Sequence, residues 1–218
     1  LTLASDIETV LGNSGVDTIT LSEAVSGNVY HLGAGTDALT LTGAGNTVTA
    51  SGVETFTGST GADLVTLTTA QTGGVYNLGA GADVLTLADG LNTLTLSGVE
   101  SLTGGTGADT ITLSAIISGA TMDLGAGVDK LTLSNGAGNT LTLSNIETLV
   151  GGSGADVITL TTAASGASLD LGLGNDTLQL ADAANTLTLN GSIESLIGGT
   201  LDDSITLTAA VSGRTIDL

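Results

Sequence analysis

The stretch that decides the fold reads Gly-Gly-Thr-Gly-Ala-Asp-Thr-Ile-Thr-Leu over residues 104–113. Its first half is rich in glycine, which supplies the positive φ that sharp turns need. Its second half alternates threonine with an apolar residue, a pattern typical of a strand with Ile111 and Leu113 inward and the threonines outward. The same alternation recurs at residues 131–133 and 140–143. We therefore expect an all-β chain of short strands and tight turns.

The stretch recurs along the chain with a period of about 46 to 47 residues, and four series of residues keep this period. The first aspartate series is Asp17, Asp63, Asp109, Asp156 and Asp203, and the second is Asp37, Asp83, Asp129 and Asp176. The glutamates are Glu8, Glu54, Glu100, Glu147 and Glu194, and the asparagines are Asn46, Asn92, Asn139 and Asn185. About four and a half units fill residues 1–218, which we expect to be a single β-solenoid fragment.

A solenoid is expected because one unit cannot bury its apolar edge alone, whereas stacked copies form continuous ladders of inward leucines. The two aspartate series alternate along the chain, and their average spacing of about 23 residues predicts about two coils per unit. About nine coils at the ~4.8 Å strand spacing would make a rod roughly 45 Å long. We favour a parallel β-helix; a flattened two-sheet β-roll is the alternative cross-section, and the pattern alone does not decide between them.

Composition excludes several classes of function. The net charge of −20, from 22 acids against Lys130 and Arg214, repels nucleic acid and anionic membrane surfaces. No apolar run is long enough for membrane insertion, and the absence of cysteine excludes thiolate metal sites. Two cations and three aromatic residues argue against a polysaccharide-cleaving β-helix. His31 has no second histidine, no cysteine and no serine in a suitable motif, so we do not expect an enzyme.

The glycine-rich turns resemble the G-G-x-G-x-D-x-U-x nonapeptide of the repeats-in-toxin (RTX) family of calcium-binding β-solenoids, found in secreted bacterial adhesins and surface-layer proteins. The fullest matches are residues 104–111 and 151–158, and residues 124–131 represent the second series. The resemblance implies Ca²⁺ shared between stacked turns, held by aspartates and glycine carbonyls. The implied metal ligands are Asp17, Asp37, Asp63, Asp83, Asp109, Asp129, Asp156, Asp176 and Asp203. Unlike the family's contiguous nonapeptides, these turns are separated by long intervening segments.

Repulsion between the aspartates favours a bound counter-ion, independently of the resemblance. Two carboxylates about 5 Å apart on stacked coils repel each other by about 3 kcal/mol at an effective ε near 20. Calcium takes six to eight oxygens, which glycine-rich turns can supply from their backbone. The alternative is that each aspartate only caps a tight turn by hydrogen-bonding the backbone two residues on. Asp123 and Asp170, two residues before a motif glycine, are candidate additional ligands.

The other two series have simpler interpretations. The asparagines predict a ladder in which each side chain bonds to the turns above and below. The glutamates follow an apolar residue, so alternation predicts that they point outward on a solvated face rather than bind metal.

These features favour a calcium-stabilised extracellular structural repeat region of a bacterial surface-layer, adhesin or filament-forming protein. Secretion is expected because sites of extracellular affinity stay empty in the cytoplasm. We expect self-association along the solenoid axis or in a lattice, with cell-surface polysaccharide as a further candidate partner. The alternative is an ice-binding solenoid that uses outward Thr-x-Thr rows, although threonine is common in strands for its β-propensity alone.

Overall fold

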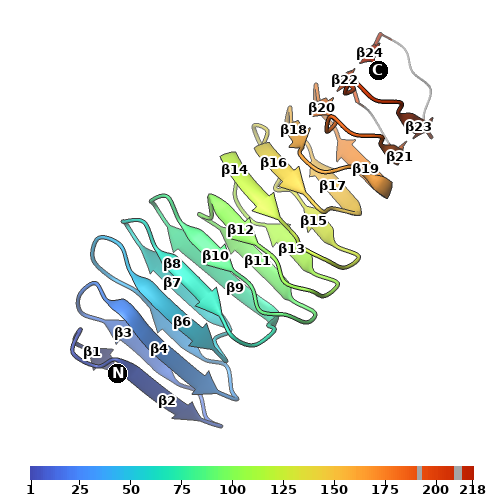
Figure 1. Cartoon of the computed structure of the whole chain (residues 1–218). Helices are drawn as coiled ribbons and strands as arrows, with labels where there is room; N and C mark the ends of the chain where they lie inside the picture. The colour runs from blue at the N-terminus through green and yellow to red at the C-terminus, as the bar shows by residue number, and fades with distance from the viewer. Residues whose placement is uncertain (191–192, 209–212) are drawn as a thin grey trace.

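The computed structural model confirms the all-β parallel solenoid. It describes residues 1–190, 193–208 and 213–218, and all the regular secondary structure in these ranges consists of β-strands. The chain winds into flattened coils that each give one strand to each of two 12-stranded parallel sheets, with the two termini at opposite ends of the rod (Figure 1). The flattened two-sheet roll is therefore the cross-section. The described residues include no helix that is long and apolar enough to cross a membrane.

The odd-numbered strands form one sheet, called sheet A: β1 (Thr2–Leu3), β3 (Thr18–Leu21), β5 (Ala38–Thr40), β7 (Thr55–Ser59), β9 (Thr72–Gly79), β11 (Thr93–Ser97), β13 (Thr110–Leu113), β15 (Lys130–Thr132), β17 (Thr148–Gly152), β19 (Ser165–Gly172), β21 (Thr186–Asn190) and β23 (Ser204–Leu207). The even-numbered strands form sheet B: β2 (Thr9–Asn13), β4 (Ser26–Gly33), β6 (Thr47–Ser51), β8 (Leu64–Leu67), β10 (Val84–Thr86), β12 (Ser101–Thr103), β14 (Ser118–Asp123), β16 (Thr140–Ser144), β18 (Val157–Leu160), β20 (Thr177–Gln179), β22 (Ser195–Ile197) and β24 (Thr215–Asp217).

Each coil contains fewer residues than the number predicted from the average spacing of the two aspartate series. The step from Asp17 to Asp37 spans one coil of 20 residues, and the step from Asp37 to Glu54 spans one coil of 17 residues. One unit spans five strands, from the start of β3 to the start of β8, and with two strands per coil this makes two and a half coils rather than two. The step from Asp37 to Asp63 is thus one and a half coils. Consecutive units therefore begin in opposite sheets.

The core lies between the sheets and consists of the inward residues that alternation predicted. Ile111 and Leu113 of β13 are almost fully buried, whereas Thr110 and Thr112 are partly exposed. Inward residues stack from coil to coil, as in the column Leu94, Ile111, Leu131, Leu149 and Leu169 of sheet A. These ladders form one continuous apolar core along the rod.

The three aromatic residues lie inside this core. Phe56 of β7 and Tyr76 of β9 are paired neighbours, and their rings stack with centroids 5.4 Å apart. The Tyr76 hydroxyl donates a hydrogen bond of 2.6 Å to the carbonyl of Val53, which satisfies its polar end. Tyr30 is also buried, and no group in the described residues pairs with its hydroxyl.

Close contact between coils makes certain glycines irreplaceable. A Cβ on Gly151 would overlap the carbonyl oxygen of Leu171 on the next coil, whereas a Cβ on Gly166 would meet nothing. We expect Gly151→Ala to lower the free energy of unfolding by about 2 kcal/mol or more through overpacking. Gly166 has φ of 71°, so Gly166→Ala should cost only about 1 kcal/mol in backbone strain. Urea denaturation of the two variants checks this, and equal losses would show that the contact between coils does not constrain Gly151.

Candidate metal centre

Every predicted metal-binding aspartate stands immediately before a strand, where the chain turns from one sheet into the other. Asp17 and Asp37 precede β3 and β5 of sheet A, whereas Asp63 and Asp83 precede β8 and β10 of sheet B. Because strands of the two sheets run in opposite directions around each coil, these two pairs lie on opposite edges of the rod. The nine aspartates therefore lie along two edges of the rod rather than in one line. The structure brings them together as pairs on adjacent coils, with Asp203 as the last member of the first series.

Each pair belongs to a longer hydrogen-bonded column, which the second unit illustrates. Asn46 Oδ1 accepts the backbone N–H of Val25 (3.0 Å), and Asp63 Oδ1 accepts that of Asn46 (2.8 Å). Asp83 Oδ1 accepts the N–H of Asp63 (2.7 Å), and Glu100 Oε2 accepts that of Asp83 (2.9 Å). Each step links one coil to the next, so the side chains satisfy backbone donors at turns that have no sheet partner.

The same column, which we call the edge column, recurs in the other units. The third unit contains Gln71, Asn92, Asp109, Asp129 and Glu147 on the sheet A edge, and the fourth contains Ile117, Asn139, Asp156, Asp176 and Glu194 on the sheet B edge. Parts of it remain in the first unit (Asp17, Asp37 and Glu54) and the last (Ala164, Asn185 and Asp203).

These contacts confirm that each asparagine side chain bonds to the turns above and below it, but consecutive asparagines lie on opposite edges of the rod and form no ladder of their own. The contacts also change the interpretation of the glutamates. Glu100 and Glu147 are not free on a solvated face, because each accepts the N–H of the aspartate one coil before it and is partly buried. A signal for this role was present in the sequence. The steps from Asn46 to Asp63 and from Asp83 to Glu100 are each 17 residues, and the step between them is 20 residues, which are the lengths of single coils.

Burial leaves several aspartates with an unused oxygen. Among the described residues, the Oδ2 atoms of six aspartates are buried and have no hydrogen-bond partner; these are Asp37, Asp83, Asp109, Asp129, Asp176 and Asp203. All four members of the second series belong to this group. A buried carboxylate oxygen without a partner costs free energy while it is charged, so these atoms call for a proton or a cation.

The pKa values of the second series reflect this environment. Burial raises the pKa of Asp129 and of Asp176 to about 6, and it also raises that of Asp83. The N–H of the preceding aspartate opposes the shift, whereas neighbouring carboxylates add to it. For Asp129 these neighbours are Asp109, Glu147 and Asp123. The edge columns are thus sites where negative charge is poorly compensated.

The fit of these residues to Ca²⁺ is partial. Carboxylate and carbonyl oxygens are the ligands that calcium prefers, and the unused Oδ2 atoms lie at glycine-rich turns. Within residues 1–190, 193–208 and 213–218, however, no three acidic or histidine side chains come together closely enough to hold a metal. A calcium ion here would take most of its six to eight oxygens from backbone carbonyls and water.

The two candidate additional ligands lie within the last three residues of their strands, β14 and β19. Asp123 ends β14, and its Oδ1 accepts hydrogen bonds from the N–H of Gly125 (3.1 Å) and the Nδ2 of Asn145 (2.7 Å). Asp170 similarly bonds the N–H of Gly172 (3.1 Å). Both are near enough to Asp129 and Asp176, respectively, to raise the pKa of those carboxyls.

His31 has a serine partner that the sequence did not reveal. His31 Nδ1 and Ser51 Oγ share a hydrogen bond of 2.6 Å across neighbouring strands. The corresponding strand positions in the next unit hold Asn77 and Ser97, which cannot form such a dyad. No carboxylate among the described residues hydrogen-bonds to His31, so the pair lacks the third group of a hydrolase triad.

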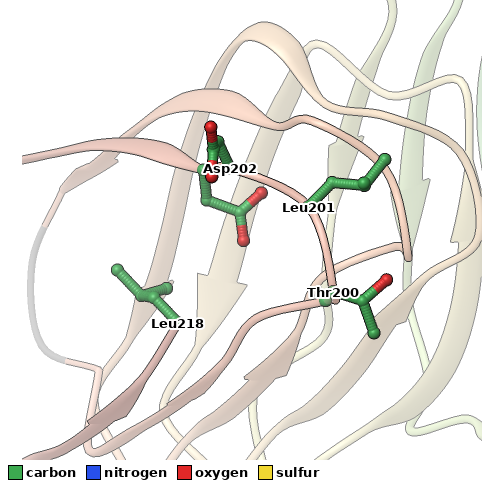
Figure 2. Close-up of a pocket in the computed structure, with 6 residues that line it drawn as sticks. Thr200, Leu201, Asp202 and Leu218 are labelled. Carbon is green, nitrogen blue, oxygen red and sulfur yellow. The ribbon is translucent and has the colours of Figure 1, made fainter.

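A hollow of about 400 Å³ lies beside the last coils (Figure 2). It is lined by the segment 199–203 and by Leu218. Thr200 already donates its hydroxyl to Asp182, and the six lining residues include no histidine, lysine or arginine. This hollow therefore lacks the base–nucleophile pair that acyl transfer needs.

Comparisons of the chain with protein-family models, with curated proteins and with solved structures gave no match.

The asparagine of the edge column should be the residue least tolerant of substitution. Asn92 is fully buried, and its Nδ2 donates to the carbonyls of Ala88 (2.9 Å) and Gly90 (3.0 Å) and to Asp109 Oδ1 (2.9 Å). Its Oδ1 accepts the N–H of Gln71 (3.0 Å). We expect Asn92→Ala to lower the free energy of unfolding by about 3 kcal/mol, because several buried groups lose their partner at once. Thermal melts should show this loss, while Thr112→Ala on the outer face should change little; equal melting temperatures for the two variants would contradict the assignment.

Proposed function

We propose that this chain is a structural rod: a calcium-stabilised, extracellular repeat region of a bacterial surface-layer, adhesin or filament-forming protein, with no enzymatic activity. One observation carries the proposal. Both 12-stranded sheets run the length of the chain without interruption, and the edge columns repeat one residue per coil along them. Such an architecture is quasi-one-dimensional, so its length is set by the number of repeats.

Calcium enters the proposal as the counter-ion of the buried aspartates. The candidate ligands remain the nine aspartates of the two series, and the six unused Oδ2 atoms support a cation at these turns. When bound, the ion would neutralise carboxylates that otherwise repel one another along each edge. Millimolar calcium is available outside the cell, which favours a secreted or cell-surface location.

The partners we propose follow from the shape and charge of the rod. Its net charge of −20 makes nucleic acid an unfavourable partner. A second copy of the rod, joined along the axis or in a lattice, and cell-surface polysaccharide are the proposed partners. Sedimentation velocity at high protein concentration with calcium tests self-association, and a strict monomer there would remove the filament from the proposal.

Modularity gives the sharpest test of the spacer function. Deleting residues 64–109 removes one unit and joins Asp63 to Thr110, so that the edge column and the strand pattern stay in phase. We expect a folded rod that is shorter by about 12 Å, which is two and a half coils at ~4.8 Å each. Small-angle X-ray scattering measures this change. Deleting only residues 64–86, half of that unit, should break the phase and prevent folding; a stable rod from that deletion would contradict the modular account.

Ice binding remains a second candidate because charge is kept away from the sheet faces. Of the 22 acids, 19 lie outside the strands, the exceptions being Asp123, Asp170 and Asp217. Sheet B presents an outward column of four threonines on consecutive strands: Thr49, Thr66, Thr86 and Thr103. The neighbouring column is interrupted by Leu64 and Val84. Thermal hysteresis that is lost in Thr66→Lys/Thr86→Lys would favour this candidate, and none at millimolar concentration would remove it.

A further inference from the structure

The third unit differs from the others in how its first-series aspartate is satisfied. In the first, second and fourth units, Oδ2 of this aspartate accepts the N–H of the residue four positions earlier, as for Asp63 and Ser59 (2.7 Å) or Asp156 and Gly152 (3.4 Å). In the third unit, Asp109 Oδ2 is buried and has no partner. Its second-series neighbour Asp129 shares this property. Among the described residues, this is the unit in which both aspartates keep an unused buried oxygen.

These two carboxylates lie on adjacent coils of sheet A. Asp129 Oδ1 accepts the N–H of Asp109 at 2.7 Å, and both side chains are fully buried. A Cβ on Gly127 would overlap the carbonyl oxygen of Gly107 and lie 2.9 Å from Asp129 Oδ1. A backbone oxygen of one coil therefore stands beside the carboxylate of the next, which is the mixed donor set that a hard cation takes.

Further negative charge surrounds this pair. Glu147 Oε2 accepts the N–H of Asp129 at 2.8 Å, and Asp123 is held nearby through Asn145. The fourth unit has Asp170 at the position of Asp123, whereas the second unit has Asn77, so the turn of the second unit carries one carboxylate fewer. More ligand charge raises calcium affinity in oxygen-ligand sites.

We propose that the third unit forms the preferential divalent-cation site of the solenoid, with Asp109 and Asp129 as its carboxylate ligands and Asp123 as an outer carboxylate that strengthens binding. This inference rests on the proposed role of calcium and makes it specific. The turns of the first, second and fourth units, whose first-series Oδ2 already accepts a backbone N–H, bind the ion more weakly, and the last unit offers a single aspartate, Asp203. The site uses two buried carboxylates rather than a cluster of three or more.

Calorimetric titration of the whole chain with CaCl₂ tests the inference through two matched double variants. Asp109→Asn/Asp129→Asn should weaken the tightest class of sites by about tenfold or more, because two ligand charges are lost. Asp63→Asn/Asp83→Asn removes the same number of charges from the second unit and should leave that class within about twofold of the parent. Both variants keep the Oδ1 acceptor of the edge column, and circular dichroism verifies that they fold.

A variant that should gain calcium binding, Asn77→Asp, provides a second test. Asn77→Asp gives the second unit the outer carboxylate of the third and should strengthen binding there, although Asp63 Oδ2 stays bonded to Ser59 and keeps this site weaker than that of the third unit. Equal weakening in the two double variants would overturn the preferential site, and no gain in Asn77→Asp would overturn the role of Asp123; both results would leave calcium stabilisation intact. Absence of binding heat and of any calcium effect on the melting temperature of the parent would overturn both.

Discussion

In metal-free buffer, the free energy of unfolding should rise by roughly 2 to 4 kcal/mol as the pH falls from 7 to 4. The pKa of Asp129 and of Asp176 is about 6 in the folded chain, against a usual value of 3.8. Between these values the folded chain binds more protons than the unfolded chain, so acidification stabilises it. The charged carboxylates of Asp129 and Asp176 therefore destabilise the folded chain most above about pH 6, and this destabilisation disappears below about pH 4. Most proteins instead lose stability as the pH falls through this interval, because their carboxylates usually have better hydrogen-bond or ion-pair partners in the folded state.

Urea denaturation in EGTA-treated buffer across this pH range measures the effect. Asp129→Asn/Asp176→Asn should flatten the profile, because the two groups that take up protons are removed. Asp89→Asn is the matched control, since Asp89 is exposed and its Oδ1 bonds Thr106, a contact that asparagine can keep. Stability that falls steadily from pH 6 to pH 4 in the parent would show that the buried carboxylates are satisfied when charged.

Calcium should have a still larger effect at neutral pH. An ion that binds only the folded chain adds about 2.7 kcal/mol per independent site at a hundredfold excess over Kd, so two sites would add about 5 kcal/mol. Mg²⁺ at equal concentration should substitute poorly, because it requires strict octahedral geometry and keeps its waters. Circular dichroism during chelation and re-addition of calcium follows the strand signal.

Variants separate a specific effect of calcium from general screening of the charge of −20. Asp109→Ala/Asp129→Ala should shift the calcium midpoint upward more than Asp89→Asn. Glu100 and Glu147 do not serve as inert controls, because both belong to edge columns. If NaCl at equal ionic strength stabilised the chain as well as calcium does, screening rather than site binding would be the cause.

Much of the fold could be predicted from the sequence because alternation and turn chemistry act locally. The segment 110–113 shows the direction of every side chain, and the glycines before it place the turn. The number of coils could not be predicted in this way, because alternation does not say which sheet a strand joins. Averaging the two unequal spacings of the aspartate series hid the half coil between Asp37 and Asp63.

The contacts of the candidate site could not be predicted from the sequence, and its glutamates were expected on a solvated face. The period identified the aspartates, whereas their bonding to the N–H groups of neighbouring coils depends on the length of each single coil. Once these lengths are known, Asn92, Asp109, Asp129 and Glu147 align as one column. The difference between a satisfied Asp63 and an unsatisfied Asp109 depends on the geometry of individual turns, which no spacing encodes.

The most direct test of the account is the stability of Asp83→Asn/Asp129→Asn/Asp176→Asn at pH 7 in EGTA. Asparagine keeps the Oδ1 acceptor of the edge column and removes the buried charge. We predict that this variant is more stable than the parent by about 2 kcal/mol or more in the chelator. Calcium should then add less to it than to the parent. A variant that is less stable than the parent in EGTA would contradict the account, because the charged carboxylates would then stabilise the coils without any counter-ion.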